Sequence, residues 1–193
     1  MVLLGIATVS NIALGPTNVL APMLIRRVMH AGAGALGVFD SSIGAGLLLG
    51  GLVMGAVPPR KVGLLFAFGI GLEGLAMGVV AVSHSLLLAY AGNFVLGLGV
   101  IVANLPTSTM FQALVPSELR GRVGSIAGML SSVAIPITYG GVGILGDAVG
   151  ARWSYGLGAI LLAAGMAAGM LNGPLRRLSL AGAQPAGSAM EPG

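Results

Sequence analysis

Long apolar runs broken by short charged or turn-forming stretches dominate this chain. Six windows of mostly apolar residues follow one another, approximately at residues 2–25, 35–57, 62–82, 86–108, 123–146 and 153–173. The breaks between them carry charge, glycine or proline, as in PPRK at 58–61 and PSELRGR at 116–122. An α-helix needs about 20 such residues to cross roughly 30 Å of hydrocarbon, so the pattern predicts six membrane-spanning helices.

The six runs favour helices over strands. They lack the alternation of apolar and polar residues that strands of a membrane barrel show. Only helices and closed barrels satisfy the backbone hydrogen bonds in lipid. The expected fold class is an all-α integral membrane protein, with one six-helix bundle over residues 1–176 and a disordered tail at 177–193. The first window has no basic leader and is long for a signal peptide, so we expect it to form the first helix.

Composition agrees with lipid as the solvent. The chain is 56% hydrophobic and 7% charged, against roughly a quarter charged in soluble domains. The net charge of +4 comes from scattered basic pairs, which argues against a nucleic-acid partner. The absence of cysteine excludes disulfides and thiolate metal sites, and it leaves the redox compartment open. The sequence also lacks a phosphate-binding glycine loop with lysine and a Gly-x-Ser-x-Gly motif, so we expect neither an enzyme nor a cofactor.

The basic residues predict an orientation in the membrane. With a cytoplasmic N-terminus, the inner segments hold Arg60, Lys61, Arg120, Arg122, Arg176 and Arg177, and the outer segments hold Arg26, Arg27 and Arg152. Both termini are therefore expected in the cytoplasm. Residues 116–122 then form a cytoplasmic loop and hinge between the fourth and fifth helices. Its members are Pro116 and Glu118, which suit a helix start, Gly121, which permits a bend, and the cationic Arg120 and Arg122.

Two acidic residues lie inside predicted spans, where an ionisable group is costly and is a functional candidate by default. Glu73 lies about 16 Å into the third span, near the bilayer midplane. It is either a carboxyl group that carries a proton for coupled transport or a neutral carboxyl group bonded to a neighbouring helix. Asp40, near the outer end of the second span, either meets Arg26 or Arg27 at an outer gate or remains hydrated.

Glycine is abundant, with 34 residues in the chain. In the second window Gly46 and Gly50 stand four residues apart, as do Gly51 and Gly55. Small residues at this spacing allow two helix backbones to approach closely. We expect such contacts either within the bundle or against a second bundle.

Several motifs resemble, in order and spacing, the C-terminal half of major facilitator superfamily transporters, in particular bacterial exporters of drugs and siderophores. The segment FQALVPSELRGRVGSIAGMLSS, residues 111–132, matches a Q-x-x-V-P-x-x-x-R-G-R-V pattern that joins two helices in that branch. LGVFDSSIGAGLLLGGLVMG at 36–55 and PTNVLAPMLI at 16–25 are similar to two further helices of that half. The resemblance covers about residues 1–176, although AVPPRK at 56–61 lacks an aspartate that the family often has there.

The resemblance implies both a fold and an activity. Such transporters place a substrate between two six-helix halves and work by alternating access. This chain would be one half, exporting a small amphipathic molecule across a bacterial inner membrane, with a proton gradient as a candidate driving force. A second six-helix half, from the same or a separate chain, is the implied partner. The alternative is a non-transporting protein, either a truncated remnant or a small accessory membrane subunit.

The resemblance also implies which helices line the cavity, namely the first and fourth of a half. These two windows hold the amides Asn11, Asn18, Asn93 and Asn104. Buried amides in lipid need hydrogen-bond partners. The four side chains are therefore candidates for a substrate pathway, and the competing interpretation is a hydrogen-bond network that holds helices together.

Overall fold

The computed structural model describes residues 17–56, 61–114 and 117–171, and every element in these ranges is a helix. The elements are α2 (Thr17–Met23), the π-helical turn η1 (Leu24–Val28), α3 (Ala33–Ala56), α4 (Val62–Val82), α5 (Leu86–Leu114), α6 (Ser117–Val149) and α7 (Ala151–Leu171). The all-helical class predicted from the apolar runs is confirmed for these ranges.

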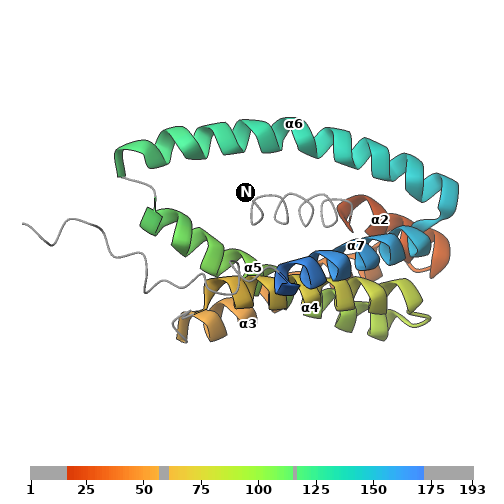
Figure 1. Ribbon diagram of the computed structural model, residues 1–193. Helices are drawn as coiled ribbons and strands as arrows, with labels where there is room; N and C mark the ends of the chain where they lie inside the picture. Colours follow the sequence, from red (N-terminus) through yellow and green to blue (C-terminus); the bar gives the residue numbers. More distant parts are fainter. Residues whose placement is uncertain (1–16, 57–60, 115–116, 172–193) are drawn as a thin grey trace, which may run out of the picture.

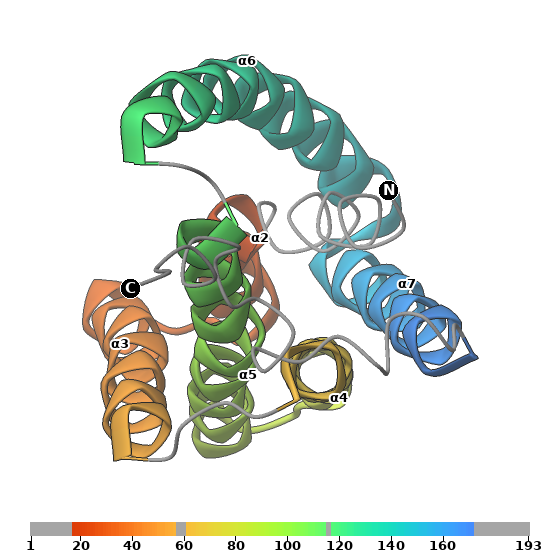
Figure 2. The same ribbon diagram turned by 60° about the vertical axis from the view of Figure 1, so that its left-hand side comes forward.

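Four of the helices form a row in the order α3, α5, α4 and α7 (Figure 2). Helix α5 packs against α3 on one side and α4 on the other, and α4 also packs against α7. Helix α6 departs from this row: it arches above the other helices and returns to them where it meets α7 (Figure 1). Its principal contacts are with α2 and α7. The described chain is thus a packed row of four helices with one long helix standing apart.

Backbone contact through glycine holds α3 against α5. A Cβ atom added at Gly46 would overlap the carbonyl oxygen of Phe94, and one added at Gly97 would overlap the carbonyl oxygen of Ile43. Because both obstacles are backbone atoms, a side chain at either position would force the two helices apart. The absence of a side chain at both positions therefore sets the distance between α3 and α5.

The two glycine pairs of α3 have different surroundings. Gly46 and Gly50 are buried on the face toward α5, where Gly50 lies against the Ile101 side chain. Gly51 and Gly55 have no described heavy atom within 4 Å of the position a Cβ would take. Only the first pair therefore brings helices together within the part of the chain that the structure describes.

Helix α4 uses glycine on two faces, which explains its central place in the row. On the α5 face, a Cβ at Gly69 would lie 2.5 Å from the backbone nitrogen of Ala103. On the α7 face, a Cβ at Gly74 would lie 3.1 Å from Cβ of Leu162. The close approach on both faces lets α4 pack against two neighbours at once.

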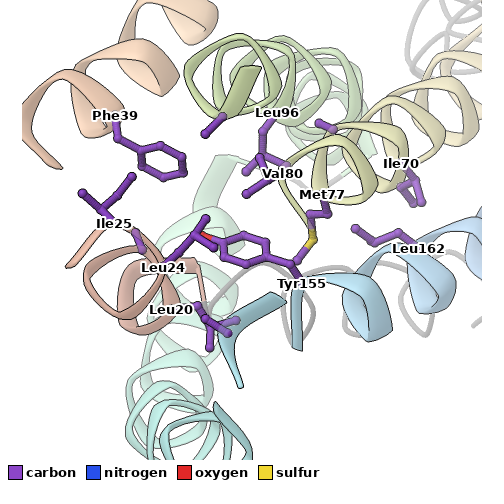
Figure 3. Close-up of a cluster of buried hydrophobic side chains, with 14 of the residues drawn as sticks. Leu20, Leu24, Ile25, Phe39, Ile70, Met77, Val80, Leu96, Tyr155 and Leu162 are labelled. Atoms are coloured by element: carbon purple, nitrogen blue, oxygen red, sulfur yellow. The ribbon is translucent and has the colours of Figure 1, made fainter. Parts of the chain in front are cut away.

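The apolar core lies where α2 and η1 meet the row of helices. Leu24 and Ile25 of η1 are fully buried, and Figure 3 shows them beside Phe39 of α3 and Tyr155 of α7. Met77 of α4 extends the cluster toward α7. In a bilayer this burial stabilises the fold through close packing, because lipid tails are as apolar as the core.

The π-helical turn follows a proline. Pro22 lies inside α2 and has no N–H group, so it cannot donate to the carbonyl of Asn18. The chain then widens into η1, where the N–H of Met29 donates to the carbonyl of Leu24 at 2.9 Å. Arg26 and Arg27 are exposed on this turn. The proline thus precedes the change in helical pitch that presents the two cations at the end of the bundle.

The short connections at this end of the bundle are capped by side chains and glycine. Ser83 Oγ donates to the carbonyl of Val80 at 2.7 Å and closes α4, and Ser85 Oγ accepts from the N–H of Leu88 at the start of α5. Gly150, between α6 and α7, has a φ of 88°, a conformation that glycine adopts without steric cost. These features allow sharp reversals with very few residues.

Four described helices are long and apolar enough to cross a membrane. They are α3, α4, the 86–105 part of α5, and α7. Most of the first predicted span lies in residues 1–16, outside the described ranges, and its remainder forms α2 and η1. Helix α6 is not among the four. The structure therefore supports a protein with several spans, and the number six remains a prediction.

The charged stretch differs from the predicted loop. Helix α6 begins at Ser117, so Glu118, Arg120, Gly121 and Arg122 lie in its first turns and are exposed on it. Glu118 in the first turn favours the helix N-terminus through the helix dipole, and no residue of 118–122 breaks a helix. Gly121 therefore lies within a continuous helix and not in a loop. Pro116 lies outside the described residues.

The glycine contact between α3 and α5 predicts unequal effects of one methyl group. Gly46→Ala should lower the free energy of unfolding by about 1–3 kcal/mol, because the added Cβ meets backbone that cannot move aside. Gly44→Ala on the same helix should change it by less than about 1 kcal/mol, since open space surrounds that position. Thermal unfolding of the two purified variants in one detergent measures the difference, and equal midpoints would contradict the proposed contact.

Candidate functional site

Glu73 is a buried acidic side chain in the middle of α4. It is 1% exposed, and its Oε2 atom has no hydrogen-bond partner among the described residues. It faces α5, because a Cβ added at Gly99 would lie 2.9 Å from Cγ of Glu73. The missing side chain at Gly99 therefore leaves room for the Cγ methylene group of Glu73 and for the adjacent α4 backbone.

The surroundings of Glu73 supply no opposite charge. On the α5 face Glu73 lies against Gly99, and at the next residue of α4, Gly74, the α7 face is filled by Leu162. The Arg27–Asp147 ion pair does not include Glu73. A charged, unpaired carboxylate in such a place is very costly, so the neutral acid is the form that this packing favours. Oε2 shows none of the interhelical bonding that the second sequence-based interpretation requires.

Asn93 joins α5 to α3. Its Nδ2 donates to the carbonyl of Phe39 at 2.6 Å and lies 3.3 Å from Ser42 Oγ. Ser42 Oγ donates to the same carbonyl at 2.6 Å. The Asn93 side chain is buried among these groups. Its geometry is that of a link between helices.

Asn104 differs from Asn93 in both exposure and bonding. It is exposed, and its Nδ2 donates to the carbonyl of Val100 one turn earlier in α5 at 2.9 Å. The amide therefore stays on its own helix and is open to a further partner. Asn11 lies outside the described residues.

Asn18 lies on the seam between α2 and α6. Its Nδ2 donates to the hydroxyl of Tyr139 at 3.0 Å. Close by, the hydroxyl of Tyr155 on α7 lies 3.5 Å from the carbonyl of Thr17. Two tyrosines from different helices thus approach consecutive residues of α2. Sequence reasoning singled out Asn18 and missed Tyr139, whose only signal was a polar aromatic residue in an apolar window.

Asp40 is exposed on α3, and no ion pair to it is present in the described ranges. Arg27 pairs instead with Asp147 at the end of α6, Nη1 to Oδ1, at 2.8 Å. Of the two interpretations of Asp40, a contact with Arg27 is not present among the described ion pairs. The exposure of Asp40 fits the alternative, a hydrated side chain.

A second cluster of polar groups lies at the same end of the bundle. Arg152, at the start of α7, donates from Nη2 to the carbonyl of Ser83 at 2.7 Å. Its Nη1 lies 3.2 Å from Nδ1 of His84. Together with the Arg27–Asp147 pair, these contacts connect the α6–α7 junction to η1 and to the α4–α5 turn. Asp147 and Arg152 were visible in the sequence as charges in GDAVGAR, but their partners were not.

A small cavity lies beside the Arg27–Asp147 pair. It has a volume of about 200 Å³ and is lined by residues of η1 and the α6–α7 junction, including Met23, Gly146 and Ala151. Pockets for drug-sized ligands usually measure about 300–1,000 Å³. The described residues include no group of three or more histidine, aspartate or glutamate side chains placed to hold a metal ion.

The comparisons with known proteins give two bacterial relatives. The chain is 26% identical over 187 residues, 92% of its length, to macrolide efflux protein A of Streptococcus pyogenes. It is 27% identical over 126 residues, 65% of its length, to the uncharacterized MFS-type transporter YvqJ of Bacillus subtilis. These similarities support a relationship to the major facilitator transporters.

The match also covers less than half of the length of each relative. The chain spans 45% of the length of the macrolide efflux protein and 30% of the length of YvqJ. No family model and no solved structure matches the chain. The bacterial relatives and the apolar helices together support a multi-pass membrane protein of the transporter class.

The two amides of α5 allow a hydrogen bond between helices to be compared with a hydrogen bond within one helix. Asn93→Ala should lower the free energy of unfolding by about 1–2 kcal/mol, because it removes the bond to α3 and leaves the Phe39 carbonyl with one donor fewer. Asn104→Ala should have almost no effect, since it removes a bond within one helix. Thermal unfolding in detergent measures both variants, and a larger loss for Asn104→Ala would refute the assignment.

Proposed function

We propose that this chain is a six-helix half of a major facilitator transporter that exports a small amphipathic molecule by alternating access. The observation that carries the proposal is the combination of apolar, bilayer-length helices with similarity to an efflux protein over 92% of the chain. The protein works in a bacterial inner membrane as a secondary transporter. A macrolide is the first substrate to test, because one relative is named for macrolide efflux.

The transporter is completed by a second six-helix half, which is either another copy of this chain or a separate chain. Supporting this is the length comparison, in which the chain spans 45% of the macrolide efflux protein. Transporters of this class bind substrate between two halves. A single half is therefore insufficient for alternating access.

Both termini lie in the cytoplasm in this proposal. In Figure 1, η1 and the start of α7 lie at one end of the bundle, and the starts of α4 and α6 lie at the other. The first two segments contain Arg26, Arg27 and Arg152, and the second two begin beside or contain Lys61, Arg120 and Arg122. In the proposed topology, Arg60, Arg176 and Arg177, which lie outside the described residues, belong to the cytoplasmic segments of the sequence. The excess of basic residues favours the second end as the cytoplasmic one.

The substrate pathway runs along the polar side chains of α2, α3 and α5. Asn18, Asp40 and Asn104 are exposed in the described half, so they are available to a substrate or to the second half. Asn93 is buried and serves the pathway indirectly, by fixing α5 to α3. Asn11 is the fourth amide of this proposed pathway. The cytoplasmic start of α6, around Arg120 and Arg122, anchors the half at the membrane surface.

Export is driven by protons, and Glu73 is the residue that takes up and releases them. In support, its carboxyl group is buried, lacks an ionic partner and has a free Oε2 atom. A carboxyl group that is neutral when enclosed and charged when opened to water is suited to carry one proton per transport cycle.

The primary experiment tests the function itself. The chain is purified from its own membrane, its native mass is measured, and the complex is reconstituted into vesicles that contain a labelled macrolide. We expect a mass that corresponds to two six-helix halves, together with macrolide movement that depends on an imposed pH gradient. A monomer without macrolide movement would instead indicate the non-transporting remnant or the accessory subunit.

The proton role of Glu73 predicts a selective defect. Glu73→Gln keeps the shape of the side chain but cannot ionise, so it should reduce pH-driven macrolide export at least tenfold. Exchange of labelled for unlabelled macrolide without a pH gradient should stay within about twofold of wild type, because exchange needs no net proton transfer. Measuring both in the same vesicles separates coupling from folding. Unchanged pH-driven export would remove Glu73 from the mechanism and leave the transporter proposal intact.

A further inference from the structure

Trp153 is the one tryptophan in the chain, and it lies on the surface of α7. It is the third residue of that helix, and 74% of it is exposed. Helix α7 is at the end of the row of helices, with α4 as its main neighbour (Figure 2). The indole ring is therefore in contact with the surroundings of the bundle at this place.

The two faces of α7 indicate what those surroundings are. Tyr155 and Leu162 are buried on one face, toward the other described helices. Trp153, Leu157 and Ile160 share another face of the helix and are exposed. Every exposed residue of α7 from 157 to 171 is apolar. Such a face suits the acyl chains of lipids.

Exposed polar side chains lie on other helices of the bundle. Asn18, Asp40 and Asn104 are exposed on α2, α3 and α5, whereas the exposed residues of α7 beyond its first turns carry no side-chain donor, acceptor or charge. A surface along an aqueous pathway needs such groups to bind water and substrate. The contrast assigns the exposed face of α7 to hydrocarbon.

At the start of α7 the surface changes from apolar to polar. Arg152 directly precedes Trp153, and its Nη1 lies 3.2 Å from Nδ1 of the exposed His84. The exposed Arg27–Asp147 pair lies at the same end of the bundle. Guanidinium and carboxylate groups in exposed positions require water or lipid headgroups around them. The hydrocarbon layer therefore ends at the level of Trp153.

The length of the apolar face agrees with this level. From Trp153 to Leu171 the helix is about 27 Å long at 1.5 Å per residue, and the hydrocarbon layer is roughly 30 Å thick. Leu171, the last residue of α7, is 85% exposed. A polar residue, Asn172, follows it in the sequence. With Leu171 at one boundary of the hydrocarbon, Trp153 lies at the other.

We propose that Trp153 anchors this end of the bundle in a phospholipid leaflet, at the boundary between headgroups and acyl chains. The partner is the lipid itself. The indole ring packs against the adjacent acyl chains, and its N–H group donates to the ester or phosphate oxygens of the headgroups. The inference concerns the placement of the bundle in the membrane and does not depend on export.

The neighbouring Arg152 extends the anchor to two more helices. Its Nη2 donates to the carbonyl of Ser83 at 2.7 Å, in the short turn between α4 and α5. Ser83 is itself buried in the bundle. A turn that is bonded to the residue beside Trp153 takes its depth from the same point of α7. The single tryptophan thus sets the depth of α4, α5 and α7 together.

The intrinsic fluorescence of Trp153 measures its depth, because no other tryptophan of the chain contributes to the signal. The purified protein is reconstituted into phosphatidylcholine vesicles in which part of the lipid carries bromine, either near the headgroup or near the methyl end of the acyl chain. Bromine quenches the indole on contact. The matched control is W153F/I160W, which moves the tryptophan about 10 Å along the same exposed face of α7.

Trp153 should be quenched about twofold more by the shallow bromine than by the deep bromine, and W153F/I160W should show the reverse order. Equal quenching of Trp153 by the two lipids, or stronger quenching by the deep bromine, would overturn the proposal. Quenching by iodide without quenching by lipid would place Trp153 in water. Quenching by neither agent would mean that protein covers it. Both of these results would also overturn the lipid assignment.

A second measurement separates anchoring from location alone. A nitroxide is attached at V82C, at the exposed end of α4, which the absence of natural cysteines allows. Its depth is measured from its collisions with oxygen in the bilayer and with a water-soluble nickel complex. The backgrounds are the natural Trp153, W153Y, which keeps an aromatic ring with a polar group, and W153L, which is apolar only. Because Trp153 is exposed, neither substitution removes core packing.

W153L should shift the depth of the V82C label by at least about 2 Å, more than the rise of one helical residue, and W153Y should keep the shift below that limit. An unchanged depth in W153L would overturn the anchor. An equal shift in W153Y would do the same, because tyrosine also prefers the membrane interface. None of these readouts involves transport, so a failed export experiment contradicts the proposed function alone.

Discussion

The contact of α5 with its two neighbours at backbone distance is the constraint on which the bundle depends. In lipid, helices gain little from hiding apolar side chains, because the solvent is equally apolar. Association must come from dense packing and from hydrogen bonds between helices. Gly46 and Gly97 supply the first on the α3 side, Gly69 and Gly99 supply it on the α4 side, and Asn93 adds a hydrogen bond. Helix α7 is then placed by its own packing against α4.

The close approach of α5 to α4 also determines the surroundings of the buried Glu73. Gly99 allows α5 to approach α4, and the place of its missing Cβ lies against Cγ of Glu73. Tight packing thus encloses an acidic group without giving it an ionic partner. The close approach of α5 to α4 and the placement of Glu73 therefore depend on the same contact at Gly99. A larger residue at Gly99 would disturb both.

Hydrophobic pattern alone predicted the helices well, because apolar length is a local property of the sequence. The window at 62–82 coincides with α4, and the windows at 35–57 and 153–173 differ from α3 and α7 by at most two residues at each end. The polar contacts between helices were harder to predict from the sequence. That Arg27 meets Asp147, and that Asn18 meets Tyr139, depends on how α6 returns to α2, which is a property of the tertiary fold. The helix start was also less predictable, because the charge at 116–122 suggested a loop, whereas residues 117–122 lie in α6.

The length of α6 has a consequence for the membrane around it. Its uncharged stretch, residues 123–146, is about 36 Å long, whereas the hydrocarbon layer is about 30 Å thick. The stretch fits this layer when it is inclined by roughly 34°. An inclined α6 beside the packed row would give the bundle a wedge-shaped outline. The thickness of the bilayer then favours one inclination over another, at fractions of a kcal/mol per ångström of mismatch. The lipid composition of the host membrane thereby becomes part of the mechanics of the protein.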